Sequence, residues 1–225
     1  MESSESPYVY RAVRAVGILA PKFQPGPEGK LFAEKLDVRG TAFWLKDHKV
    51  LVTCAHVVQN LLGAPVEVTG LLVVGNLGNY TRATVSVLDF GHDLAILQLA
   101  DAPQDFVNQE VLTGLEIVDF YPQVGCAVAY AGFPLGVQLL NSTQAPTYAE
   151  GVIGAQLRRH PLRKEIQITG VVVGGFSGAP IVLKDDPTKV VGVLSNSPST
   201  DAGGANIFMV VSWEHVRALA GLSKS

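Results

Sequence analysis

The sequence predicts an all-β protein, because strand-like patterns of apolar and polar residues recur along most of its length. Strict alternation, which is typical of half-buried strands, occurs at residues 66–69, 83–87 and 165–169. Continuous apolar runs, which suit strands buried on both faces, occur at residues 49–53, 94–99 and 190–194. The 23 glycines and 13 prolines supply frequent turns. Many short strands joined by turns favour a β-sandwich or a β-barrel.

Further elements follow from the same patterns in chain order. Expected strands in the N-terminal part cover residues 14–17, 40–45 and 50–53. The last two form a hairpin that leads to His56, and a short helix is expected after His56, through residues 61 and 62. At the C-terminus, Ser212 can cap a helix with one apolar face, and Gly221 ends it.

Composition and charge limit the classes of function. With 225 residues, 48% of them hydrophobic, the chain can bury a sizeable core as one domain or as two small fused barrels. A net charge of −3 and a pI near 5.9 give no long-range attraction to nucleic-acid phosphates or to an anionic membrane. No apolar run reaches the roughly 18 residues of a membrane span, and no signal peptide is apparent. We therefore expect a cytoplasmic protein without nucleic-acid or membrane partners.

Three residues that lie far apart in the sequence supply the parts of a nucleophilic site. Ser177 lies in the glycine-rich run 174–180, His56 follows the expected hairpin, and Asp93 opens an apolar strand. A serine hydroxyl is a weak nucleophile, so it needs a base, and the base needs a carboxylate that fixes its tautomer. Taken alone, His56 could be a core histidine and Asp93 a strand cap. Together, in the order His, Asp, Ser, they predict a catalytic triad.

Two glycines support this prediction. Gly175 and Gly178 flank Ser177 and allow the backbone to turn sharply. That turn would point the amides of Gly175 and Ser177 at one spot, as an oxyanion hole requires. Losing one such donor typically costs roughly 2.7–4 kcal/mol of transition-state stabilisation.

The chain resembles the trypsin-like serine peptidases, and among them the HtrA-like bacterial type. The resemblance rests on the three triad residues with their flanks, on residues 167–169 before the Ser177 loop, and on residues 131–134 after a strand. It implies two six-stranded antiparallel β-barrels with the active site in the cleft between them. The single peptidase domain, 1–225, would comprise barrels at about 10–115 and about 122–211, with a helix at about 212–221. We expect no PDZ domain, because the chain ends soon after that helix.

The resemblance also implies a substrate pocket. Its residues would be Val171, Ser195, Asn196, Ser197 and Asn206. Val171 would form the floor, where a buried arginine or lysine of the substrate would lack a counter-charge, so we expect a small or medium apolar P1 residue. Asp201, between the walls, is the one residue that could reverse this preference. Ser195 would donate a hydrogen bond to Asp93, or alternatively bond to its own strand.

The two cysteines agree with an intracellular protein, since secreted members of this class usually carry several disulfides. A Cys54–Cys126 disulfide is one alternative, and two buried free thiols are the favoured one. A metal site of His48, Cys54 and His56 is disfavoured, because its spacing matches no zinc pattern. The sequence shows no cofactor motif, so none is expected.

The predicted function is that of a serine endopeptidase with narrow specificity and activation by a loop or a partner protein. Its partners would be a protein or peptide substrate and that activating protein. Phe176 stands where many members carry an aspartate that receives a new N-terminus, so we expect activity without N-terminal cleavage. The basic run 158–164 is a solvated turn or, alternatively, recruits an acidic region of a substrate. A catalytically silent binding module with the same fold is the alternative function.

Overall fold

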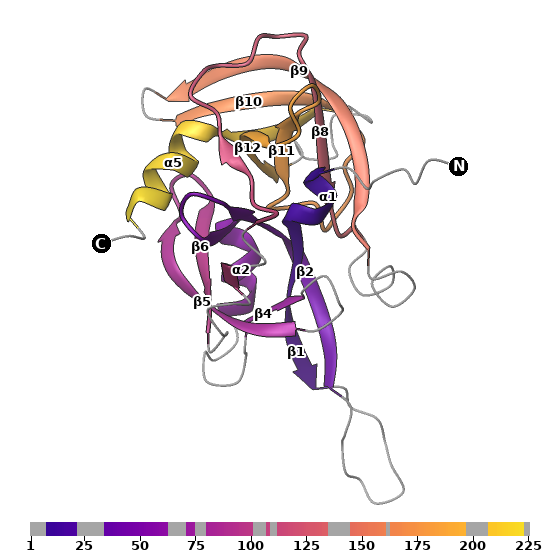
Figure 1. Ribbon diagram of the computed structural model, residues 1–225, viewed down its shortest axis with the longest axis vertical. Helices are drawn as coiled ribbons and strands as arrows, with labels where there is room; N and C mark the ends of the chain where they lie inside the picture. The colour runs from indigo at the N-terminus through magenta and orange to yellow at the C-terminus, as the bar shows by residue number, and fades with distance from the viewer. Residues whose placement is uncertain are drawn as a thin grey trace, which may run out of the picture.

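Six antiparallel strands from the first half of the chain close into a barrel, in the order β1-β2-β3-β6-β5-β4 (Figure 1). The computed structural model describes residues 8–21, 34–62, 71–74, 80–100, 107–108, 112–134, 145–160, 163–196 and 207–222. The strands of this barrel are β1 (Val13–Pro21), β2 (Glu34–Leu45), β3 (Val50–Thr53), β4 (Leu71–Val74), β5 (Tyr80–Asp89) and β6 (Leu94–Leu99). Pairing of β1 with β4 closes it. A closed barrel leaves no unpaired strand edge.

A second ring of strands follows. Its members are β8 (Ala127–Gly132), β9 (Thr147–His160), β10 (Arg163–Gly170), β11 (Pro180–Leu183), β12 (Lys189–Asn196) and β13 (Ile207–Ser212). They pair in the order β11-β8-β9-β10-β13-β12, and β11 also pairs with β12, which joins the two ends of the sheet. The short β7 (Glu116–Ile117) adds to β12 in parallel. The predicted all-β fold with six-stranded antiparallel barrels is confirmed.

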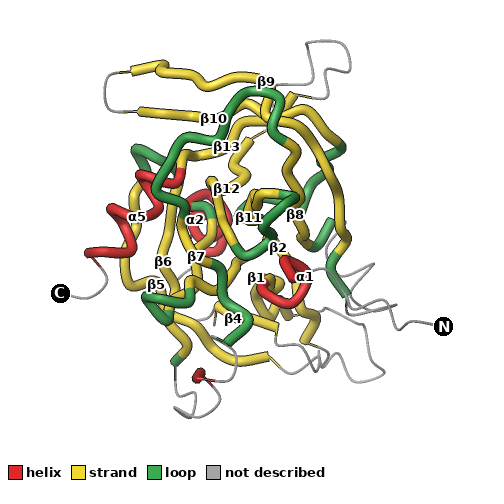
Figure 2. Tube along the Cα trace, turned by 45° about the horizontal axis from the view of Figure 1, so that its top comes forward, coloured by secondary structure: helices red, strands yellow, loops and turns green. Residues whose placement is uncertain are grey.

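In the part of the chain that the structure describes, the named helices are α1 (Tyr8–Ala12), α2 (Ala55–Leu62) and α5 (Trp213–Leu222). The helix expected after His56 is present, and it begins at Ala55, so that it includes His56. The C-terminal helix begins after Ser212 and continues one residue past Gly221; Figure 2 shows it on the outside of the molecule near the C-terminus. The expected cap is wrong, because the Ser212 hydroxyl is buried and bonds to no residue of the described part. Ser212 ends β13 and pairs with Gly192, so strand pairing fixes its conformation.

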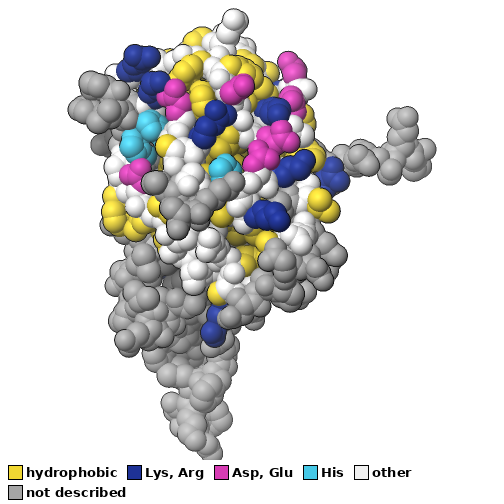
Figure 3. All heavy atoms as spheres, turned by 60° about the vertical axis from the view of Figure 1, so that its left-hand side comes forward, with side chains coloured by type: hydrophobic (Ala, Val, Ile, Leu, Met, Phe, Trp, Pro, Cys, Tyr) yellow, Lys and Arg dark blue, Asp and Glu magenta, His cyan; other side chains and the backbone are white. Residues whose placement is uncertain are grey.

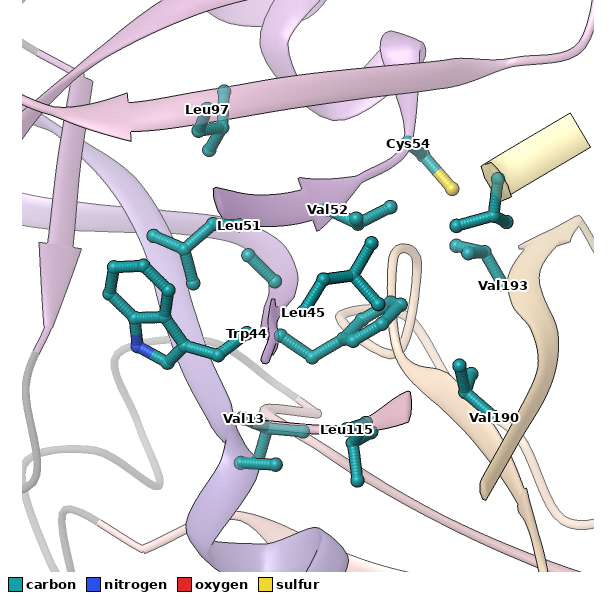
Figure 4. Packing of buried hydrophobic residues seen from close by; sticks show 14 of the residues in the cluster. Val13, Trp44, Leu45, Leu51, Val52, Cys54, Leu97, Leu115, Val190 and Val193 are labelled. Atoms are coloured by element: carbon teal, nitrogen blue, oxygen red, sulfur yellow. The ribbon is translucent and has the colours of Figure 1, made fainter. Parts of the chain in front are cut away.

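One core cluster joins the two barrels. Figure 4 shows Trp44, Leu51 and Val52 of the first barrel in the same apolar cluster as Val190 and Val193 of β12. All of these side chains are at most 2% exposed. Burial of apolar surface at the junction holds the barrels together. Within the described residues, no helix is long and apolar enough to cross a membrane.

Candidate active site

Strand pairing brings His56 and Asp93 together. β3 ends at Thr53, shortly before His56, and β6 begins immediately after Asp93. These two strands are antiparallel neighbours with Thr53 opposite Ala95. The end of one strand therefore lies beside the start of the other, and residues that lie far apart in the sequence become neighbours in space.

The Asp93 carboxylate accepts three hydrogen bonds. The His56 backbone N–H donates to Oδ1 at 2.9 Å, and His56 Nδ1 lies 2.8 Å from Oδ2. The Ser195 hydroxyl donates to Oδ2 at 2.5 Å, which confirms its predicted contact with Asp93. Burial acts to raise the pKa of Asp93, but the hydrogen bonds from His56 and Ser195 outweigh it and hold this pKa below its ordinary value. Asp93 is therefore ionised at neutral pH.

The Ser177 loop needs both of its flanking glycines. Gly175 and Gly178 have φ angles of 104° and 86°, in the left-handed region. A Cβ at Gly175 would lie 2.2 Å from the Phe133 carbonyl oxygen. A Cβ at Gly178 would lie 2.0 Å from the Thr41 carbonyl oxygen. A larger residue at position 178 would therefore collide with β2 of the first barrel, and one at position 175 would collide with the segment that follows β8.

Thr41 of β2 docks this loop on the first barrel, a role that sequence reasoning missed. Its backbone N–H donates to the Ser177 carbonyl at 2.8 Å, and its hydroxyl donates to the Gly175 carbonyl at 2.8 Å. The same hydroxyl accepts the Phe133 N–H at 3.2 Å. Thr41 is fully buried. Nothing in the sequence near Thr41 distinguishes it from any other strand threonine.

Replacing Thr41 with valine is expected to lower kcat/KM on the order of tenfold, because the Gly175 carbonyl and the Phe133 amide lose their buried partner. Stability should fall by about 1–3 kcal/mol. Peptide hydrolysis and denaturant unfolding check the two effects. Thr41→Ser keeps the hydroxyl and serves as the control. Wild-type turnover in the valine variant would contradict the docking role.

The backbone around Ser177 leaves two amides available. The Phe176 amide donates to the Val173 carbonyl at 3.3 Å, and the Gly178 amide donates to the Leu194 carbonyl at 2.8 Å. By contrast, the amides of Gly175 and Ser177 donate to no residue in the part of the chain that the structure describes. The amides of residues 175 and 177 could therefore donate to a bound group, whereas those of residues 176 and 178 are already bonded within the chain.

The Ser177 carbonyl and the side chain of Val57 both lie close to Gly40. A Cβ at Gly40 would lie 2.8 Å from the Ser177 carbonyl oxygen and 2.6 Å from the side chain of Val57, the residue after His56. Ser177 is half-buried. Among the described contacts, the Ser177 hydroxyl makes no hydrogen bond with the His56 ring. The structure thus brings all three predicted triad residues to the junction of the barrels, with only the His56–Asp93 contact formed.

A family model for the trypsin-like peptidase domain matches residues 40–193, a span that contains all three triad residues. The chain belongs to the trypsin-like peptidase family. This trypsin-like peptidase is similar in fold to the Rv3671c protease of M. tuberculosis in its active form. That pair has 21% sequence identity and a TM-score of 0.66, over 95% of this chain and 81% of the other.

An inactive form of Rv3671c that carries a serine-to-alanine mutation is similar as well. It has 19% identity and a TM-score of 0.64, and the match covers 98% of this chain and 91% of that one. No curated protein sequence matches this trypsin-like peptidase. At these identities the structural matches show the shared fold, and the family model confirms the predicted resemblance to trypsin-like serine peptidases.

Cys54 lies close to His56 and Asp93 in this trypsin-like peptidase. Both cysteines are free, so the disulfide alternative is wrong; Cys54 is buried, whereas Cys126 is only half-buried. Burial, and secondarily the charge of Asp93, raises the pKa of the Cys54 thiol well above its ordinary value. One ligand atom each of Cys54, His56 and Asp93 lies within 4.8 Å of the others. His48 is not in this group, and the thiol donates to the Leu194 carbonyl at 3.2 Å.

The predicted substrate pocket lies partly outside the described residues. Val171 is 67% exposed, and its backbone N–H and carbonyl both bond to the Tyr130 hydroxyl at 3.0 Å. Ser195 is buried against Asp93. The Asn196 backbone belongs to β12, but its side chain is outside the described set, as are Ser197, Asp201 and Asn206 entirely. The pocket therefore stays a prediction.

Phe176 anchors the Ser177 loop of this trypsin-like peptidase in the second core. Its side chain is 2% exposed and meets the Tyr130 ring edge to face, with centroids 5.6 Å apart. An apolar anchor needs no newly formed amino terminus as its counter-charge. This packing agrees with the expectation of activity without N-terminal cleavage, which stays a prediction.

Proposed function

We propose that this protein is a serine endopeptidase in which Ser177 is the nucleophile, His56 the general base and Asp93 the residue that orients it. The observation that carries the proposal is the ionised Asp93 carboxylate with three donors around it. Because Asp93 accepts the proton on His56 Nδ1, the lone pair of His56 lies on Nε2, the nitrogen that must take the serine proton.

The reaction would proceed in two halves. Ser177 Oγ attacks the peptide carbonyl while its proton moves to His56 Nε2, and the amides of Gly175 and Ser177 donate to the resulting oxyanion. The C–N bond then breaks, and the leaving amine takes the proton from His56. Water attacks the acyl-enzyme and gives its proton to His56; the Ser177–acyl bond then breaks while His56 returns this proton to Ser177 Oγ, which releases the acid and restores the enzyme. The two amides are available for this role because they make no bond to the described chain.

Control of activity is a further part of the proposal. The resting structure has the His56–Asp93 contact but no hydrogen bond between Ser177 and His56 in its described part. Catalytic hydrogen bonds are often long in free enzymes and tighten in the substrate complex. We propose that the substrate, or an activating partner protein, completes this contact, which would support narrow specificity. The two free cysteines support a site of action in the cytoplasm.

Covalent labelling tests the proposed function directly. A fluorophosphonate probe, which reacts with activated serines, is incubated with the purified chain, and peptide mass mapping then locates the label. We expect the label on Ser177 and none on the heat-unfolded chain. A folded chain that never labels, with or without candidate substrates, would indicate the catalytically silent binding module instead.

Substrate preference follows from the apolar residues near Ser177. Val171 and Val173 of the Ser177 loop are 67% and 46% exposed, and neither carries charge. We expect peptides with valine, alanine or leucine at P1 to show kcat/KM values at least about tenfold above those with arginine or lysine. Matched peptides that differ only at P1 provide the measurement. Preference for a basic P1 residue would contradict this prediction and implicate Asp201.

The basic run at 158–164 is partly described. Lys164 Nζ lies 2.6 Å from a Glu214 carboxylate oxygen, so one of its cations is paired within the molecule. Arg158 is exposed. Recruitment of an acidic substrate region by this run stays a proposal, and it would rest on Arg158 more than on Lys164.

A further inference from the structure

Asp93 has an unusual backbone conformation. Its φ angle is 58°, in the left-handed region that residues other than glycine rarely adopt. Such a conformation persists only where the surrounding structure holds it. The turn that leads from β5 into Asp93 must therefore be fixed by its own contacts.

The residue before Asp93 makes those contacts. The His92 backbone N–H donates to Asp89 Oδ1 at 3.1 Å, and His92 Nδ1 lies 2.6 Å from Asp89 Oδ2. Burial acts to raise the pKa of Asp89, but the hydrogen bond from His92 outweighs it and the pKa lies below its ordinary value. The His92 ring is thus bound to an ionised carboxylate at the end of β5.

The other side of the His92 ring contacts the second half of the chain. It stacks on the His215 ring, with centroids 4.0 Å apart and an angle of 22° between the rings. His215 lies in the first turn of α5, which packs against β5 and β6 (Figure 1). Figure 3 shows the side of the molecule that carries α5 in Figure 1, where histidines lie among acidic and basic side chains.

His215 is neutral in this arrangement. Its Nε2 accepts the Lys164 backbone N–H of β10 at 3.0 Å, so this nitrogen carries no proton. Burial lowers the pKa of His215, and the neighbouring His92 lowers it further. Of the other charged groups that face it, Lys164 also opposes its protonation, whereas Glu214 and Asp89 favour it.

We propose that His92 and His215 are positioning residues that hold Asp93 in its left-handed conformation, and that they do so only while His215 is neutral. A path of direct contacts runs from Lys164 through His215 to His92, the residue immediately before Asp93. Protonation of His215 would put a proton on Nε2 and break the bond from the Lys164 N–H. The role in catalysis rests on the proposed function, whereas the effect on the His56–Asp93 bond does not.

Two substitutions of His215 separate the effect of its hydrogen-bond acceptor, Nε2, from the effect of its stacked ring. His215→Gln keeps a hydrogen-bond acceptor and cannot titrate, whereas His215→Phe keeps the stacked ring and has no acceptor. His48→Gln is the matched control elsewhere in the first barrel. Peptide kcat and KM are measured from pH 5 to pH 9. Proton NMR of the His56 Nδ1–H that bonds to Asp93 is recorded in parallel, since this signal needs no turnover.

In His215→Phe we expect kcat to fall about tenfold at pH 8 with KM little changed, together with a shifted or broadened His56 signal. In His215→Gln, which keeps the acceptor but loses the ring that stacks on His92, we also expect kcat to fall about tenfold at pH 8, together with one proton fewer in the acid limb of the kcat profile. A His56 signal in His215→Phe that is identical to wild type at every pH would overturn the positioning role, whatever the peptidase activity. An acid limb that His215→Gln leaves unchanged would overturn the dependence on neutral His215.

Discussion

Ser177→Ala is expected to reduce peptide hydrolysis by about a million-fold, because it removes the atom that forms the acyl-enzyme. The fold should survive, since the Ser177 carbonyl that binds the Thr41 amide is backbone and remains. Hydrolysis of a protein substrate, fluorophosphonate labelling and the melting temperature are measured together. We expect no turnover, no label and an unchanged melting temperature.

The same variant separates the two candidate functions. If the protein is an endopeptidase, Ser177→Ala should still bind its substrate and leave it intact. If the protein is a binding module, the variant and the wild type should bind a ligand equally and neither should cleave it. Turnover that persists in the alanine variant would place the nucleophile elsewhere and contradict the proposed triad.

Asp93→Asn is expected to lower kcat by about ten thousand-fold. The amide NH2 of asparagine would donate to His56 Nδ1, so the ring proton would move to Nε2, where His56 could no longer accept the serine proton. The Ser195 hydroxyl, which now donates to Asp93, would lose a charged acceptor. Hydrolysis rates check this prediction, with the exposed Asp119→Asn as the control. A fall of only a few-fold would mean that Asp93 does not set the tautomer of His56.

The pH dependence of stability provides a second readout for Asp93. Because folding lowers its pKa, the ionised carboxylate stabilises the folded state above its unfolded pKa, and this contribution is lost as pH falls through the folded pKa. The melting temperature of Asp93→Asn should therefore lie furthest below wild type near neutral pH. The two curves should approach each other in acid. Parallel curves would contradict the lowered pKa.

The sequence by itself determined the class of fold and pointed to the three residues of the predicted triad. Alternation and apolar runs are local patterns, because side chains on the buried face of any strand must be apolar. The strands could therefore be predicted without knowing which strands they pair with. Ser177 was recognisable because its loop needs positive φ at Gly175 and Gly178, and glycine meets that need locally. His56 and Asp93 were recognisable by their order and by the strands beside them.

Only the tertiary structure decided which groups from distant parts of the sequence contact the Ser177 loop and the turn before Asp93. The docking of the Ser177 loop by Thr41 and the stack of His92 on His215 join segments that no local pattern relates. The expected cap at Ser212 failed for the same reason, because pairing with Gly192 prevailed over the local preference. Local patterns record what each segment buries, whereas these contacts depend on how the two barrels close and pack, which is a property of the whole chain.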